Sequence, residues 1–406
     1  MNKIMIVLFL SGMVIGFFSI GSAWAEEEIP VFEKHPPTEL TTVEERPLVQ
    51  MAILLDTSGS MSGLIDQART ELWAMVNEFI FAKRNGKEPE LQVALYEYGK
   101  SSLPRKEGYI KMIVPFTTDL DKVSEELFAL KTNGGDEYCG WVIKEATQSL
   151  TWSNSSDDLK VVFIAGNEPF TQGPVDYRQA CKAAVAKGIV VNTIHCGSTK
   201  AGLDGKWKDG AVLADGQYLN IDQSRKTIHV AAPQDKQIAE LGVKLNDTYI
   251  AYGQWGNVAM GRQRTQDRNA AAASKEAELQ RAVTKSSLYY KNELWDLVDA
   301  VSSNKVKLED VKEEDLPEKM KKMNKEERKT YIEAQAKQRV KIQQRIQELN
   351  EQRKKYVAEE MKKRQLQGYT LGSAVIKAVR DQAKEKNFTF ESSEKSSKNL
   401  DPDASQ

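Results

Sequence analysis

An aspartate and two serines stand at alternate positions directly after an apolar run near the start of the chain. Residues 49–55 are mostly apolar, and the run ends at Asp56, which is followed by Ser58 and Ser60. If residues 50–55 form a buried strand, these side chains lie in the loop at its carboxyl end, where open α/β sheets bind their ligands. Carboxylate and hydroxyl oxygens together suit Mg²⁺, Mn²⁺ or Ca²⁺ rather than zinc or copper. The alternative is a loop that only caps the next helix, since Ser and Asp are common capping residues.

Strands and helices alternate after this loop, which predicts a doubly wound α/β fold with a mostly parallel, Rossmann-like sheet. The strands are expected at residues 50–55, 91–95, 110–114, 160–165, 189–195 and 217–221. The helices are expected at residues 63–83, 119–131, 137–151, 177–187 and 234–252. Because the last of these helices would close the sheet, residues 47–252 are expected to form one α/β domain that folds on its own.

The D-x-S-x-S pattern of Asp56, Ser58 and Ser60 resembles the metal-ion-dependent adhesion site (MIDAS) of the von Willebrand factor type A (VWA) domain. Two further loops depart from the family pattern. Residues 134–137 read Gly-Gly-Asp-Glu and place Asp136 where most VWA domains have a threonine, whereas Gly166 stands where a third loop usually has an aspartate. The resemblance therefore implies a modified site with the metal ligands Asp56, Ser58, Ser60 and Asp136, in which the carboxylate at Asp136 replaces the one lost at Gly166. The alternative is a decayed site that keeps the fold and has lost the metal.

For function, the resemblance implies an exported, non-enzymatic protein that mediates protein–protein interaction or adhesion. Asp56 and Asp136 would anchor Mg²⁺ (with Mn²⁺ or Ca²⁺ as alternatives), and an acidic side chain of a protein partner would complete the coordination shell. A structural scaffold whose metal site has decayed is the second hypothesis, and its basic helical region would do the binding.

A metal-assisted hydrolase is the third hypothesis, and it needs a general base beside the metal. Glu137, Glu168 and His195 are the candidates near the predicted loops, and none of them belongs to a catalytic motif. His195 and Cys196 end a predicted strand, and their adjacency favours a structural role over soft-metal binding because no second His or Cys cluster has ligand spacing.

The first 25 residues have the features of a secretory signal peptide. One lysine precedes an apolar run over residues 4–20, and Ala23-Trp24-Ala25 matches a cleavage site, so we expect the mature chain to start at Glu26 and to be periplasmic or secreted. An uncleaved membrane anchor is the alternative, and no later segment is apolar enough to span a bilayer. Residues 26–46 are acidic and rich in proline, as in an extended linker. The three cysteines either include one disulfide or are all buried thiols.

The carboxy-terminal part of the chain changes composition. Residues 253–273 indicate a hinge, residues 274–390 a charged helical region, and residues 391–406 a disordered tail. Apolar residues at a and d positions would favour a coiled coil, but Arg339 and Arg353 interrupt that seam, so a helical hairpin is the alternative.

The carboxy-terminal helical region differs from the whole chain in its net charge. The whole chain has 57 Lys+Arg against 58 Asp+Glu, which argues against nucleic acid as a partner. Residues 317–366 have 16 Lys and Arg against 8 Glu, a net charge of +8. This excess belongs either to a solvated helix face or to a contact with an anionic component of the cell envelope.

Overall fold

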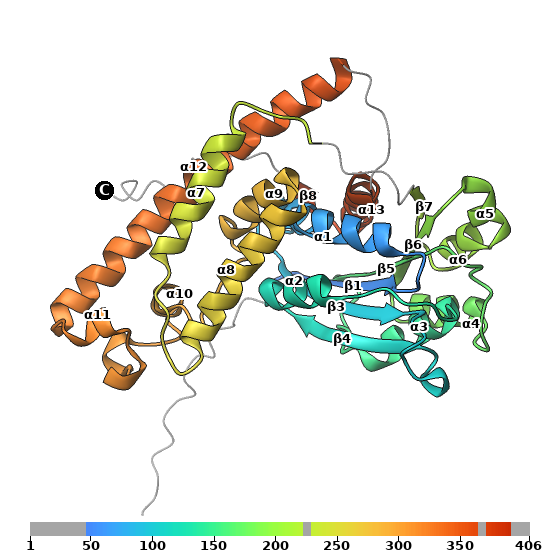
Figure 1. Ribbon diagram of the computed structural model, residues 1–406, viewed down its shortest axis with the longest axis horizontal. Helices are drawn as coiled ribbons and strands as arrows, with labels where there is room; N and C mark the ends of the chain where they lie inside the picture. The colour runs from blue at the N-terminus through green and yellow to red at the C-terminus, as the bar shows by residue number, and fades with distance from the viewer. Residues whose placement is uncertain (1–45, 222–228, 364–370, 391–406) are drawn as a thin grey trace, which may run out of the picture. The chain divides into compact units, whose positions relative to one another are not determined.

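The computed structural model describes residues 46–221, 229–363 and 371–390 (Figure 1). The predicted signal peptide (residues 1–25), residues 26–45 of the predicted linker and the predicted disordered tail (residues 391–406) lie outside these residues.

A six-stranded sheet forms the centre of the described part, with the strand order β4-β3-β1-β5-β6-β7. All neighbouring strands are parallel except β3 and β4, so the predicted doubly wound, mostly parallel sheet is confirmed. The strands are β1 (Leu48–Asp56), β3 (Glu90–Tyr98), β4 (Ile110–Thr117), β5 (Leu159–Gly166), β6 (Val190–Cys196) and β7 (Tyr218–Ile221). The strand order reverses at β1, so the carboxyl ends of β1 and β5 border the crevice in which such sheets bind ligands.

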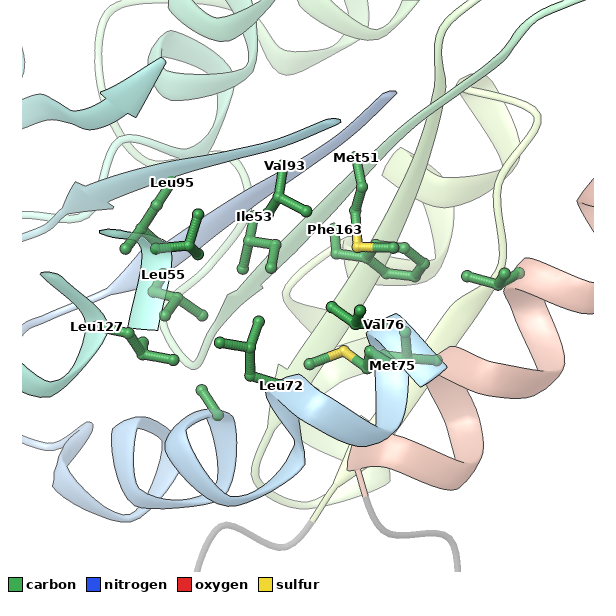
Figure 2. Packing of buried hydrophobic residues seen from close by; sticks show 14 of the residues in the cluster. Met51, Ile53, Leu55, Leu72, Met75, Val76, Val93, Leu95, Leu127 and Phe163 are labelled. Atoms are coloured by element: carbon green, nitrogen blue, oxygen red, sulfur yellow. The ribbon is translucent and has the colours of Figure 1, made fainter. Parts of the chain in front are cut away.

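Helices cover both faces of the sheet, and this explains why β1 is apolar at nearly every position. On one face, Met51, Ile53 and Leu55 pack against α1 (Ser62–Asn77) and α2 (Leu120–Ala129), as Figure 2 shows. On the other face, the intervening side chains of β1 pack against α3 (Cys139–Ser149), α4 (Tyr177–Ala186) and α6 (Trp207–Leu213). A short helix, α5 (Thr199–Asp204), precedes α6.

Helix α13 (Leu371–Glu385) returns from the end of the described chain and packs beside α1 on the same face of the sheet (Figure 1). Its buried side chains belong to the same core as β1; they are Val375, Ala378, Val379 and Ala383. Gln382 exchanges side-chain hydrogen bonds of 2.7 and 3.1 Å with Asn192 of β6. The next strand, β8 (Thr389–Phe390), pairs antiparallel with β2 (Ala82–Lys83). The α/β unit is therefore discontinuous in sequence, and the boundary predicted at residue 252 leaves out one of the helices that cover the sheet.

The helix predicted to close the sheet at residues 234–252 is shorter and lies elsewhere. It is α7 (Asp235–Leu245), followed by a 3-10 turn, and its apolar side chains pack against α9 (Lys275–Lys285) and α12 (Lys325–Lys363). The hinge predicted at residues 253–273 is wrong for most of its length, because residues 256–273 form α8 (Gly256–Ala273). The run Ala270 to Ala273 favours a helix intrinsically, and Ala270 is fully buried. Short helices α10 (Leu297–Ser302) and α11 (Glu318–Lys321) complete this layer.

Helix α12 is 39 residues long, and its seam packs inside the chain rather than in a coiled coil with another copy. Arg339 and Arg353, which interrupt the apolar seam, are both buried and paired with carboxylates. The Nη1 atom of Arg339 lies 2.6 Å from Asp296, and Arg353 lies 2.7 Å from Asp235 and 2.5 Å from Glu276. These pairs explain how two arginines fit a seam that otherwise carries isoleucine and leucine.

A buried charge cluster joins the helical layer to the α/β unit. Arg281 of α9 is 2% exposed and lies 2.6 Å from Asp121 of α2 and 2.9 Å from Asp267 of α8. Its guanidinium also stacks over the ring of Trp73 in α1, 4.5 Å from the centroid. Removing one partner of such a group leaves a buried charge unpaired, so this cluster fixes the position of α9 on α1 and α2.

Two sequence expectations concern membranes and cysteines. None of the helices within the described ranges combines the length and apolar character needed to cross a bilayer. Cys139, Cys181 and Cys196 are buried and free, which corresponds to the alternative without a disulfide.

Candidate metal centre

The first loop of the candidate site begins where β1 ends. Asp56 is fully buried, and its Oδ1 accepts a hydrogen bond of 2.7 Å from the backbone N–H of Ser58. The hydroxyl of Ser58 lies 3.3 Å from that of Ser60, so both hydroxyl oxygens lie on one side of the loop. Thr57 between them is tied to β3 by a 2.8 Å hydrogen bond from its N–H to the carbonyl of Tyr98. The structure thus brings together three of the four residues expected to bind metal.

The second loop is attached to the first. The N–H of Asn133 donates to the carbonyl of Thr57 at 2.9 Å. Asp136, the fourth expected ligand, is exposed, and its Oδ2 accepts a 3.2 Å hydrogen bond from the Tyr138 hydroxyl. Glu137, the next residue, is only 3% exposed and lies against Asp56. The structure therefore places the side chain of Glu137, and not that of Asp136, beside Asp56.

The third loop contributes Asn167, whose side-chain oxygen accepts a 3.4 Å hydrogen bond from the Ser60 hydroxyl. Gly166, at the position where the family usually has an aspartate, has no room for a side chain. A Cβ atom there would lie 2.5 Å from the hydroxyl oxygen of Tyr98 and 3.2 Å from Oδ2 of Asp56. Tyr98 is fully buried and donates a 3.0 Å hydrogen bond to the carbonyl of Ala165. The tyrosine hydroxyl thus takes the space that the missing aspartate would need.

Burial controls the protonation of the two carboxyl groups. Desolvation, followed by repulsion from Asp56, raises the pKa of Glu137 to about 9. Desolvation also raises the pKa of Asp56, to about 6, against the opposing effect of a hydrogen bond with Glu137. The two groups therefore share one proton near neutral pH, which Glu137 donates to Asp56. A protonated Glu137 is a poor general base, which weakens the hydrolase hypothesis.

One carboxylate oxygen of Asp56 has its hydrogen-bonding capacity unsatisfied by the residues that the structure describes. The Oδ2 oxygen of Asp56 is buried and receives no hydrogen bond from any amide, hydroxyl or amine group in the described part of the chain. A buried carboxylate oxygen without a partner is costly. A hard divalent cation would satisfy it, and the neighbouring hydroxyl, amide and carboxyl oxygens of Ser58, Ser60, Asn167 and Glu137 are the ligand types that such ions prefer.

The donor set excludes a softer metal. Within residues 46–221, 229–363 and 371–390, no group of three or more His, Cys, Asp and Glu side chains is arranged to hold a metal ion. A cation at Asp56 would therefore depend on the serine hydroxyls. His195 and Cys196 are buried in the sheet, where desolvation lowers the pKa of His195 and raises that of Cys196. Their packing corresponds to the structural role expected for this pair.

The sequence interpretation named Glu137 only as a candidate base and Asn167 only as a residue that could reach the site through water, and it missed Tyr98. The signal for Tyr98 was present, since a tyrosine at the last position of a buried strand next to β1 has its hydroxyl at the ligand edge of the sheet. No comparable signal marked Glu137 as a ligand, because its neighbour Asp136 is an equally good ligand by residue type.

The family comparison agrees with the fold described above. The von Willebrand factor type A domain family matches residues 50–204. No curated protein has a significant match to the sequence. Domains of this family are typically non-enzymatic interaction modules, and they often bind a divalent metal ion.

Three solved structures are similar to part of this chain at low identity. BatB from Bacteroides thetaiotaomicron is 18% identical, with 43% of this chain and 91% of that chain covered and a TM-score of 0.33. The SpRpn10 VWA domain is 16% identical, with 44% and 90% covered and a TM-score of 0.33. An aerotolerance-related membrane protein from Bacteroides fragilis is 16% identical, with 43% and 92% covered and a TM-score of 0.29. The family match, together with the sheet and its crevice, shows that the chain contains a von Willebrand factor type A domain.

Proposed function

We propose that this chain is an exported binding protein whose VWA domain recognises a protein partner through a divalent cation, Mg²⁺ in the first place and Mn²⁺ or Ca²⁺ as alternatives. The observation that supports this proposal most directly is the buried Oδ2 atom of Asp56, which accepts no hydrogen bond from an amide, hydroxyl or amine group in the described residues. Beside it stand the hydroxyls of Ser58 and Ser60, 3.3 Å apart. A carboxylate between hydroxyl oxygens is a ligand set for a hard cation.

The residues of the site would have different roles in binding the cation. Asp56 binds the ion directly, Ser58 and Ser60 contribute neutral oxygens, and a carboxylate from residues 134–137 supplies the second negative charge. When bound, the cation offers a positive charge that accepts an acidic side chain from the partner. Ser60 and Asp136 are exposed, so this side of the site is open to a protein surface.

Export and the basic helical region belong to the same proposal. The signal-like residues 1–25 support a periplasmic or secreted location. Helix α12 carries exposed lysines along much of its length, which would favour a salt-sensitive contact with an anionic envelope component.

The experiment is affinity purification of the full-length protein from its native envelope after cross-linking, with Mg²⁺ or with a chelator, in parallel with the Asp56→Asn variant. A partner that is lost both with chelator and in the variant would support metal-bridged recognition. A partner that is kept under both conditions would contradict it and would favour the scaffold hypothesis.

A further inference from the structure

We infer that Glu137, rather than Asp136, is the second anionic ligand of the cation site, and that it serves because Tyr98 excludes a carboxylate from the third loop. The inference rests on the proposed cation site and assigns its ligands. It departs from the ligand set that the family resemblance implies, in which Asp136 has this role.

The position of Glu137 is fixed by contacts on both sides of its side chain. Its backbone N–H donates to the side-chain oxygen of Gln172 at 2.5 Å, and its Oε2 accepts from the N–H of Glu168 at 3.3 Å. A Cβ atom at Gly99 would lie 2.7 Å from Cγ of Glu137 and 2.8 Å from Oδ1 of Asp56. One methyl-sized space thus touches both side chains, so the side chain of Glu137 lies close to the carboxylate of Asp56. Gly99 has φ +78°, a conformation that also favours glycine at this point.

Asp136 faces the other way. Its side chain is exposed, and its carboxylate is bound to the hydroxyl of Tyr138 at 3.2 Å. Tyr138 in turn belongs to a row of aromatic rings with Tyr109 and Trp141, at centroid distances of 5.7 and 6.2 Å. To reach the cation, the side chain of Asp136 would have to leave Tyr138 and turn inward, whereas the side chain of Glu137 already lies beside Asp56.

The packing of the Tyr98 hydroxyl against Gly166 gives the reason for this ligand set. The Tyr98 hydroxyl occupies the third-loop position, 2.5 Å from where a side chain at Gly166 would begin. At the position next to Gly166, the third loop offers the neutral amide oxygen of Asn167, which contacts Ser60. Asp56 and Glu137 then supply two negative charges to the ion. It follows that the cation binds to the chain alone and does not require the partner.

The test uses the full mature chain and Mn²⁺ as the probe, measured by calorimetry and by the electron paramagnetic resonance spectrum of bound Mn²⁺. Glu137→Gln keeps the size of the side chain and mimics its protonated form, so this variant should fold. We expect Glu137→Gln to weaken Mn²⁺ binding by about 10-fold or more, because loss of even an outer-shell partner of a metal ligand typically costs about 10–100-fold in affinity. Asp136→Asn should bind within about twofold of the parent. The exposed acid Glu240 on α7 provides a charge-matched control as Glu240→Gln.

The outcomes separate this inference from the proposed function. If the parent binds Mn²⁺, and Asp136→Asn loses the ion while Glu137→Gln keeps it, the ligand assignment is overturned and the cation site stands. If the folded parent does not bind Mn²⁺, both are overturned. Thermal unfolding of each variant, followed by circular dichroism, shows whether a loss of binding reflects loss of the fold.

Discussion

Removing helix α13 should unfold the α/β unit, although α13 lies about 150 residues beyond the last strand of the sheet. The side chains that carry the effect are Val375, Val379 and Phe388, which are 1%, 1% and 2% exposed and belong to the core shared with β1. Full burial of each such side chain contributes about 1.5–3 kcal/mol, so the three together contribute roughly 4.5–9 kcal/mol. A folded domain is stable by about 5–15 kcal/mol. A chain that ends at residue 370 should therefore retain little or no stability.

The assay is urea unfolding of the mature chain and of the truncated chain, followed by circular dichroism and tryptophan fluorescence. Val379→Ala offers a milder version, with an expected loss of about 2 kcal/mol from two methyl groups and the cavity they leave. Val340→Ala is the matched control, because Val340 is 49% exposed and its loss should change stability by less than about 0.5 kcal/mol. A truncated chain with the same midpoint and slope as the parent would refute the role assigned to α13.

Four further predictions concern the site and the helical layer. Because the pKa of Glu137 is raised, the folded, metal-free chain binds a proton that the unfolded chain lacks between about pH 4.5 and 9. The contribution of Glu137 to the free energy of unfolding should be full below about pH 4.5 and should fall as the pH rises to about 9. Glu137→Gln should make the free energy of unfolding, measured by urea titration, less dependent on pH. For the same reason Mg²⁺ binding should release a proton near pH 7, so the calorimetric heat should change with the ionisation enthalpy of the buffer, whereas equal heats in two buffers would contradict a protonated Glu137. Gly166→Ala should destabilise the chain by about 1–3 kcal/mol, because the added methyl group clashes with Tyr98. Adding Tyr98→Phe should recover part of this loss. Strictly additive effects of the two substitutions in a double-mutant cycle would argue against the clash. Arg339→Met should cost about 3–5 kcal/mol because it leaves the buried carboxylate of Asp296 unpaired, and a variant as stable as the parent in urea would contradict that pairing.

Local patterns were sufficient to predict the sheet and the first loop. An apolar run that ends in D-x-S-x-S has one natural position in an α/β sheet, and Asp56 lies there. The helical pattern of the region after residue 274 was equally local. The partners of these elements are not local, and this is where the sequence interpretation failed. Val375 and Val379 lie on an apolar stripe that any helix could bury, and the surface that covers them, α1, is about 300 residues away in the sequence.

The same limit applies to single residues. Asp136 and Glu137 are adjacent carboxylates, and which of them turns inward depends on a hydrogen bond from the Glu137 backbone to Gln172, 35 residues later. Arg353 interrupts a seam in the sequence but becomes a core residue once Glu276, 77 residues earlier, lies against it.

The most direct measurement for the central claim is a calorimetric titration of Mg²⁺ into the mature, chelator-treated protein, with Asp56→Asn as the comparison. The account predicts saturable binding of one ion per chain in the parent and loss of that binding in the folded variant, since the amide keeps the shape of the side chain and removes its charge. A folded parent that gives only the heat of dilution, or a variant that binds Mg²⁺ as tightly as the parent, would contradict the cation site at Asp56.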